Sequence, residues 1–254
     1  MHTVRAEDRE GGVRLLTLDR PPAHALDETV LADLDAALVG AERDAAVRAV
    51  VLTATGTFFS GGFDLRAPRR DATATRILGT LYRDSHLRLL ALPKPTVAMV
   101  NGHAIAGGLI LALACDYRLG VESDWKLGLN EVAIGAAFPR IALEVVRLRL
   151  PHSRAAELML GAGLHPAAQA RRLGVVEELL PADRFAATVL RRAARLGAFP
   201  REAYAHTKAA LLEDVVARVR AETDDEAART ASIWTTAESR AARAAQRARL
   251  ADKS

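Results

Sequence analysis

The sequence predicts an α/β fold, and three observations support this. Short apolar runs typical of strands alternate with longer segments whose apolar residues repeat at helical spacing. Two of the strand-like runs end in glycine-rich turns. From about residue 139 onward the strand signal fades and helical, Ala- and Arg-rich stretches dominate. Repeated strand and helix units of this kind imply an α/β core.

The elements of the first half follow from local patterns. Residues 13–18 and the short apolar run at 49–53 predict strands. Between them, residues 28–42 carry apolar side chains at helical spacing after Asp27, a good helix N-cap. The same order of types returns with a helix at 73–92 and a strand at 96–100, which Asn-Gly follows.

The second half predicts helices at residues 185–196, 201–212 and 213–250. A helical tail of this kind buries little surface by itself, so we expect it to pack against the core or against another subunit. The only candidate boundary is GAFP at residues 197–200. We therefore divide the chain into a core at residues 1–196 and a helical region at 197–254.

The composition is that of a globular protein. Of the 254 residues, 50% are apolar and 26% are charged, a balance that excludes a disordered chain. The net charge of +4 arises from 35 basic residues spread among 31 acidic ones. This distribution favours mild attraction for an anionic ligand over a nucleic-acid surface.

Cysteine use and apolar runs indicate the compartment. Cys115 is the only cysteine and lies in an apolar stretch at residues 109–115, which argues against disulfides and favours a reducing compartment. The N-terminal residues lack the apolar core of a signal peptide, and no apolar run approaches the ~18 residues of a membrane span. We expect a cytoplasmic protein with no membrane span.

Two glycine-rich turns carry the most chemical information. GTFFSGGFDL at residues 56–65 follows the first buried strand, and NGHAIAGG at residues 101–108 follows the second and opens an apolar helical run. Each turn places exposed backbone N–H groups beyond the end of a strand. One such turn alone could serve only tight packing, but two in this order favour a paired site.

Three common glycine-rich sites do not match these turns. Both have Gly, four residues, then Gly-Gly, so the Lys-Ser/Thr of a P-loop is missing. Neither contains the G-x-G-x-x-G of a dinucleotide site. Ser60 lacks the glycine two residues before it that a nucleophile elbow requires.

Four ordered motifs resemble the crotonase (enoyl-CoA hydratase/isomerase) family. They are FSGGFDL at 59–65, NGHAIAGG at 101–108, CDYR at 115–118 and GLNEVAIG at 128–135, and RPPAHAL at 20–26 is also similar. The resemblance runs from about residue 13 to residue 180. It implies a spiral of ββα units, with residues 197–254 as a trimerisation region.

The resemblance also implies the ligand and the assembly. The substrate would be an acyl-CoA thioester, and no cofactor is expected beyond the coenzyme A of that substrate. A homotrimer or a dimer of trimers is the implied assembly.

The resemblance places the thioester oxygen between two backbone N–H groups, those of Phe63 and Gly107. Negative charge builds on this oxygen when a proton is removed beside the thioester, and each preformed donor is worth roughly 3 kcal/mol. Gly107 also gains from the N-terminal end of the helix it begins. Phe63 stands where the family usually has a small residue; its ring either narrows the acyl pocket or joins the core, and we favour the core.

The resemblance assigns coenzyme A to two segments. These supply Ala23, His24, Ala25 and Leu26 from the first segment, and Gly61, Asp64 and Leu65 from the second. His24 replaces a common asparagine, and we expect a structural role for it. Candidate contacts for the pyrophosphate are Arg66, Arg69 and Arg70, and residues 67–75 predict a loop beside the acyl site.

Glu131 is the candidate acid/base residue, because it occupies the position of one catalytic glutamate of the family. An apolar pocket would disfavour its charged form and raise its pKa into the range useful for proton transfer. The other glutamate of the hydratase pair would lie three residues beyond Gly107, and here that residue is Ile110. With Ile134 and Phe138, Ile110 is assigned to the acyl pocket.

One base can move a double bond, whereas hydration normally draws on both carboxylates. We therefore expect an enoyl-CoA isomerase in which Glu131 carries the proton. Two alternatives stay open: an enoyl-CoA hydratase that works with a single glutamate, and a non-catalytic member of the fold that binds a CoA thioester.

Other residues suggest plainer roles. Arg240, Arg243, Arg247 and Arg249 cluster near the C-terminal end, but acidic residues offset them at 222–226 and no aromatic residues are interleaved, so no nucleic acid is expected. No group of residues has metal-ligand spacing, and no metal is predicted. We expect Asp116 to tie down a strand end, and Trp125 and Trp234 to serve packing.

Overall fold

A six-stranded sheet forms the centre of the computed structural model, which describes residues 2–64 and 72–251. Its strands in spatial order are β1 (Val4–Arg9), β2 (Val13–Leu18), β3 (Ala49–Ala54), β5 (Thr96–Val100), β7 (Tyr117–Val121) and β10 (Glu178–Leu180). β1 pairs antiparallel with β2, and all the other neighbours are parallel. Every residue of β3 and β5 is buried, as expected of central strands covered on both faces.

Four short strands form a second, smaller sheet. It contains β4 (Phe58–Ser60), β6 (His103–Ile105), β8 (Lys126–Gly128) and β9 (His165–Pro166). β4, β6 and β8 are mutually parallel and directly follow β3, β5 and β7. The chain therefore repeats a long strand and a short strand, and both glycine turns lie where a short strand ends.

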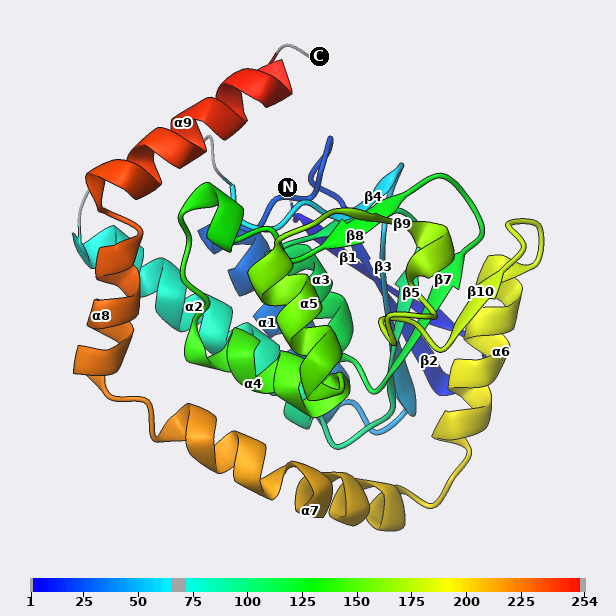
Figure 1. The fold of residues 1–254 in the computed structure, drawn as a ribbon. Coiled ribbons are helices and arrows are strands. Elements are labelled where there is room, and N and C mark those ends of the chain that lie inside the picture. Colours follow the sequence, from blue (N-terminus) through cyan, green and yellow to red (C-terminus); the bar gives the residue numbers. More distant parts are fainter. Residues whose placement is uncertain (1, 65–71, 252–254) are drawn as a thin grey trace.

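Helices cover the large sheet on both faces (Figure 1). The helices of the first part are α1 (Glu28–Arg43), α2 (Ala72–Ala91), α3 (Gly107–Ala114), α4 (Arg140–Arg149) and α5 (His152–Gly161), with short 3-10 turns η1 (Glu10–Gly12), η2 (Val132–Ile134) and η3 (Ala167–Gln169). The predicted N-cap is confirmed, because the Asp27 carboxylate accepts a hydrogen bond from the N–H of Val30 at 2.9 Å. All eight residues of α3 are buried.

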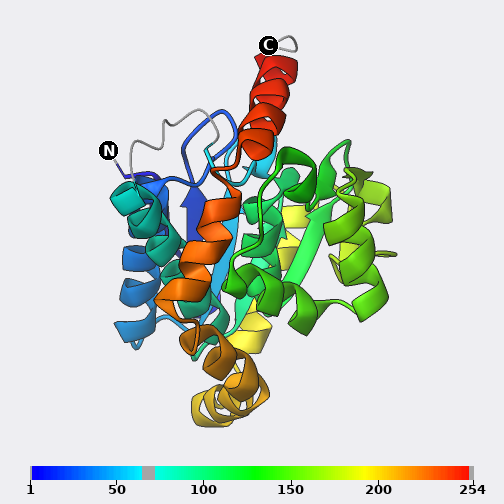
Figure 2. The same ribbon diagram turned by 60° about the vertical axis from the view of Figure 1, so that its left-hand side comes forward.

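The C-terminal helices run along the outside of the core (Figures 1 and 2). They are α6 (Phe185–Gly197), α7 (Arg201–Arg220), α8 (Asp224–Ile233) and α9 (Ala237–Ala251). The predicted break at residue 212 is wrong, since α7 continues through it. The helical region is interrupted instead between α7 and α8, just before Thr223. The Thr223 hydroxyl accepts a hydrogen bond from the N–H of Glu226, and the Glu226 side chain accepts one from the N–H of Thr223.

A buried ion pair joins α7 to the sheet. The Asp116 carboxylate accepts a hydrogen bond from the N–H of Thr96 at 3.0 Å, so the prediction that Asp116 ties down a strand end is confirmed. The same carboxylate accepts from Lys208 Nζ at 2.8 Å and from the Tyr204 hydroxyl at 3.0 Å, both on α7. One carboxylate therefore holds a strand and a distant helix together.

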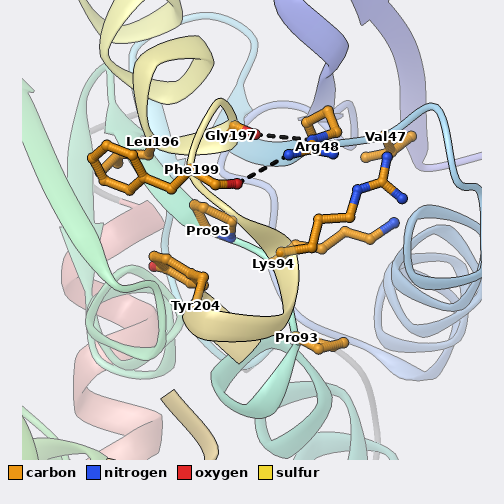
Figure 3. Close-up of a pocket in the computed structure, with 10 residues that line it drawn as sticks. Val47, Arg48, Pro93, Lys94, Pro95, Leu196, Gly197, Phe199 and Tyr204 are labelled. Carbon is orange, nitrogen blue, oxygen red and sulfur yellow. Dashed lines mark hydrogen bonds between the residues drawn. The ribbon is translucent and has the colours of Figure 1, made fainter. Parts of the chain in front are cut away.

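The junction between α6 and α7 encloses a small cleft of about 40 Å³ (Figure 3). Arg48 donates hydrogen bonds to the carbonyls of Gly197 and Phe199 at 2.9 and 3.0 Å. Lys94 Nζ donates to the carbonyls of Ala41 and Asp44 at 2.6 and 2.8 Å. The Arg48 side chain thus binds the backbone of the α6–α7 junction, and we assign this cleft to docking of the C-terminal helices.

Candidate active site

The two glycine turns lie in direct backbone contact. Gly62 has φ +79°, and a Cβ on it would lie 2.9 Å from the carbonyl oxygen of Ile105 and 3.0 Å from the backbone nitrogen of Gly107. A Cβ on Gly108 would lie 2.2 Å from the carbonyl oxygen of Ser60. Only glycine permits this approach at both positions.

The backbone of each turn fixes the direction of one N–H group. Leu26 donates to the carbonyl of Gly62 at 2.8 Å and accepts from the N–H of Asp64 at 3.2 Å. In such a parallel bridge the N–H of the intervening residue, Phe63, points away from Leu26.

Gly107 is the first residue of α3, so its N–H has no acceptor within the helix. Ala106 before it adopts φ 51°, ψ −129°, a sparsely populated conformation for a residue with a side chain. The N–H of Ala106 donates to the carbonyl of Gly128 at 2.7 Å, which ties this turn to β8. The fold therefore sets the orientation of the Ala106–Gly107 peptide through backbone strain and a fixed hydrogen bond.

Glu131 lies directly before η2 and is 6% exposed. Its Oε2 makes no hydrogen bond with any residue in the described part of the chain. Burial raises the pKa of this carboxyl to about 8. The backbone of the segment is fixed, because the Glu131 carbonyl accepts from the N–H groups of Ile134 and Ala136 at 3.1 and 2.8 Å.

Tyr82 of α2 connects these groups, and sequence reasoning missed it. Its ring centroid lies 4.7 Å from that of Phe63, and its Cε2 lies 3.4 Å from where a Cβ of Gly107 would stand. Burial and the charge of Glu131 both raise the pKa of Tyr82. A tyrosine inside a helical segment gives no local signal of this role, because its partners come from other elements.

The family model for enoyl-CoA hydratase/isomerase matches residues 8–247 of the sequence. The chain belongs to this family. Human mitochondrial enoyl-CoA delta isomerase 1 is 31% identical over 225 residues, which cover 85% of this chain and 73% of the relative. A putative enoyl-CoA hydratase of Thermus thermophilus is 38% identical over 179 residues, which cover 68% of this chain and 69% of the relative.

Solved structures of the family share the fold. The crystal structure of human mitochondrial delta3-delta2-enoyl-CoA isomerase superposes with a TM-score of 0.94 at 26% identity, and the match covers 99% of each chain. The predicted crotonase fold, with its spiral core and C-terminal helices, is therefore confirmed.

The residues assigned to the acyl pocket of this enoyl-CoA hydratase/isomerase family member lie in two different clusters. Ile110 is fully buried in the main core, and Phe138 packs partly buried against that core. Ile134 belongs to a second, smaller cluster with Ala136 and Trp234, against which Phe63 packs. The ring of Phe63 contacts both clusters and so lies where they meet.

The segments assigned to coenzyme A lie beside each other. The N–H of Gly61 donates to the carbonyl of Ala23 at 2.8 Å, and the Asp64 carboxylate accepts from Arg20 at 2.7 Å. His24 is 1% exposed; its Nδ1 accepts from the N–H of Arg20 at 3.0 Å and its Nε2 lies 2.7 Å from the carbonyl of Thr55. The His24 side chain is therefore structural, as expected. Leu65, Arg66, Arg69 and Arg70 lie outside the described residues.

The C-terminal helices hold the Glu131 segment from outside. Trp234 Nε1 donates to the carbonyl of Ala137 at 2.9 Å, and Arg243 of α9 donates to the carbonyl of Gly135 at 3.2 Å. The Arg243 guanidinium also lies 5.7 Å from the centre of the Trp234 ring. Trp234 is thus packed in the interior, as predicted, and Arg243 belongs to an internal contact. Trp125 is likewise buried, and its Nε1 donates to the carbonyl of Val121 at 2.7 Å.

Residues 2–64 and 72–251 contain neither a membrane-spanning helix nor a metal-binding cluster. None of their helices combines the length and the apolar character that crossing a membrane requires. No three His, Cys, Asp or Glu side chains in these ranges lie where they could hold a metal ion.

Proposed function

We propose that the chain is an enoyl-CoA isomerase that moves the double bond of a 3-enoyl-CoA thioester to the 2 position. One observation carries this proposal: Glu131 is buried, its Oε2 has no hydrogen-bond partner among the described residues, and its charge acts on Tyr82, which packs against Gly107, while Ile110 occupies the position of a second carboxylate. This arrangement supplies Glu131 as a base for proton transfer and, at the position of the second glutamate, no carboxylate to activate water.

The proposed reaction begins with the thioester oxygen between the N–H groups of Phe63 and Gly107. The Glu131 carboxylate removes a proton from C2, and the electrons of that C–H bond delocalise through the thioester onto its oxygen and through the double bond to C4. The two N–H groups stabilise the resulting negative charge. Glu131 then returns the proton to C4, which leaves the double bond between C2 and C3.

The environment of Glu131 suits this step. A base with a pKa near 8 is stronger than an exposed glutamate, and it still ionises near neutral pH. An apolar site also keeps water away from the reactive enolate. We assign the coenzyme A moiety to the segments of residues 23–26 and 61–64, which the Gly61–Ala23 hydrogen bond aligns.

Hydration is the second candidate, because the relative from Thermus thermophilus is named as a putative enoyl-CoA hydratase. In that reaction Glu131 alone would activate water. The third possibility is a member that binds a CoA thioester without turning it over.

The deciding experiment offers purified protein 3-enoyl-CoA and 2-enoyl-CoA substrates and follows both the conjugated thioester and the 3-hydroxyacyl product. Isomerisation without hydration is the expected result. Prompt formation of 3-hydroxyacyl-CoA would replace the proposal with the hydratase, and tight binding without turnover would favour the binding protein.

Glu131→Gln should abolish turnover. Glu144→Gln is the matched control. Glu144, on α4, is also buried, but it forms ion pairs with Arg147 of the same helix and with Arg218 of α7. Activity should survive in the folded fraction of this control.

The proposal includes the assembly and the compartment. We propose a homotrimer or a dimer of trimers, supported by exposed apolar residues on the C-terminal helices: Leu211 is 74% exposed and Ile233 48%. Light scattering after size-exclusion chromatography measures the mass directly. We place the enzyme in the cytoplasm, in keeping with the buried free thiol of Cys115 and a bacterial relative, and cell fractionation tests this.

A further inference from the structure

Three aromatic rings from different parts of the chain form a continuous row beside the paired turns. The Phe63 ring lies 4.7 Å from the Tyr82 ring of α2 and 5.6 Å, edge to face, from the Trp234 ring that follows α8. These centroid distances are those of rings in contact. An alkyl chain therefore has no passage between neighbouring members of this aromatic row.

The aromatic row stands at the reacting end of the site. Phe63 supplies both the central ring and one proposed oxyanion donor, and Tyr82 packs against Gly107, which supplies the other. The charge of Glu131 is close enough to Tyr82 to raise its pKa further than burial alone. We therefore place the carbons next to the thioester beside this row.

Both ends of the row are anchored. At one end, the Trp234 indole donates to the carbonyl of Ala137, and the Arg243 guanidinium lies against its ring. At the other end, the fully buried His86 ring contacts the Tyr82 ring in a tilted arrangement with centroids 3.9 Å apart, and its Nδ1 lies 2.8 Å from the carbonyl of Tyr82. Because burial lowers the pKa of His86 to about 4, this ring stays neutral in the working pH range.

A second cleft, of about 310 Å³, lies between the Glu131 segment and α9 and is the competing place for a long acyl chain. Its lining is mostly apolar and includes Ile134, while Asn130, Gln246 and Arg249 are its polar members. Asn130 Oδ1 is buried and makes no hydrogen bond within the described ranges. A long chain that entered this cleft would bypass the row, and an affinity that rises steadily to dodecanoyl in the first experiment below would reveal it.

We propose that the aromatic row of Phe63, Tyr82 and Trp234 closes the acyl side of the site, so that the enzyme selects short-chain acyl-CoA and excludes long chains. This inference rests on the proposed function for its substrate class. In an open apolar pocket, each added methylene would raise the affinity about fourfold. A closed row ends this gain once the chain reaches the rings.

The first experiment measures the wild-type protein with two series of ligands. Calorimetry gives the affinities of saturated acyl-CoAs from butyryl to dodecanoyl, and turnover of the matching 3-enoyl-CoAs gives kcat/KM. Affinity should stop rising near hexanoyl, and kcat/KM should fall about tenfold or more from hexenoyl to dodecenoyl. Affinity that rises steadily to dodecanoyl would overturn the proposal.

The second experiment opens the row. Trp234→Leu and Phe63→Ala remove rings while the backbone N–H of residue 63 is kept, and each should raise the dodecanoyl-to-hexanoyl affinity ratio about tenfold. Phe199→Ala is the control, because Phe199 lies at the α6–α7 junction (Figure 3) and is 47% exposed. An unchanged ratio in both opened variants would also overturn the proposal.

The two measurements separate this inference from the proposed function. If binding shows a chain-length limit but no enoyl-CoA is isomerised, the proposed role of the aromatic row stands and the proposed isomerase activity is rejected. Isomerisation with equal kcat/KM for short and long chains would retain the isomerase and reject the row. Thermal unfolding identifies variants that fail to fold, in which case the wild-type series alone decides.

Discussion

The α carbon of Gly62 lies against the backbone nitrogen of Gly107, so closely that a Cβ on Gly62 would stand 3.0 Å from that nitrogen. Two turns far apart in the sequence thus meet through their backbones. Of the two proposed oxyanion donors, Gly107 forms this contact and Phe63 directly follows Gly62. The contact should therefore control the spacing of the two N–H groups.

Gly62→Ala should therefore lower kcat/KM about a hundredfold, because the methyl group would displace the Gly107 N–H and would also occupy a positive-φ position. Gly79→Ala on α2 is the control, since a Cβ there meets nothing within 4 Å. It should retain activity and gain about 0.5–1 kcal/mol of stability. Equal activity in both variants would show that the spacing of the turns is unimportant.

The pH profile should report Glu131. The base must be deprotonated, and its pKa in the free enzyme is raised to about 8. We therefore expect kcat/KM to rise with pH and to level off above about 8. A profile already flat from pH 6 would contradict a buried glutamate base.

Glu131 should also affect stability. Its pKa is about 8 in the folded protein and near 4.5 in the unfolded chain, so between these values the folded state binds more protons. Stability attributable to this group then falls as the pH rises from 4.5 to 8. Glu131→Gln should be the more stable protein at neutral pH, by up to about 3 kcal/mol, in urea titrations that compare pH 5 with pH 7. No change in the stability difference between these pH values would count against the raised pKa.

Ile110→Glu should introduce hydration. It places a carboxylate one turn beyond Gly107, where the second glutamate of the hydratase pair would lie, and the 3-hydroxyacyl product should then appear by chromatography. Because Ile110 is fully buried, the variant should lose about 2 kcal/mol or more of stability. Ile110→Gln has a similar shape without the charge and should give no hydration. Hydration by the Gln variant would show that the carboxylate is not the missing group.

The Asp116 anchor should matter for stability and not for chemistry. Asp116→Ala leaves Lys208, 7% exposed, without its carboxylate and should cost about 3–5 kcal/mol in denaturant unfolding. Tyr204→Phe removes only one hydrogen bond and should cost about 1 kcal/mol. Both variants should keep the wild-type kcat per folded molecule. A selective fall in kcat would instead indicate communication between α7 and the active site.

The sequence located most elements of the core because their signals are local. The strands at residues 13–18 and 96–100 match the structure at both ends, and Asp27 caps α1 as its side chain predicts. β1 escaped notice because five of its six residues are exposed, which is typical of an edge strand and removes the alternating pattern. The start of α8 carried a recognisable signal in Thr223 and Glu226, a capping box, which the helical periodicity of the tail obscured.

By itself, the sequence determined the glycine turns, the order of the family motifs and the absence of a carboxylate at Ile110, since each is a property of one short segment. Only the tertiary structure decided that Tyr82 and Trp234 flank Phe63, and that Glu131 is buried with its Oε2 unpaired among the described residues. Desolvation and ring contact depend on groups that different elements bring together. A raised pKa and a closed aromatic row therefore exist only once α2, η2 and the C-terminal helices have packed around the turns.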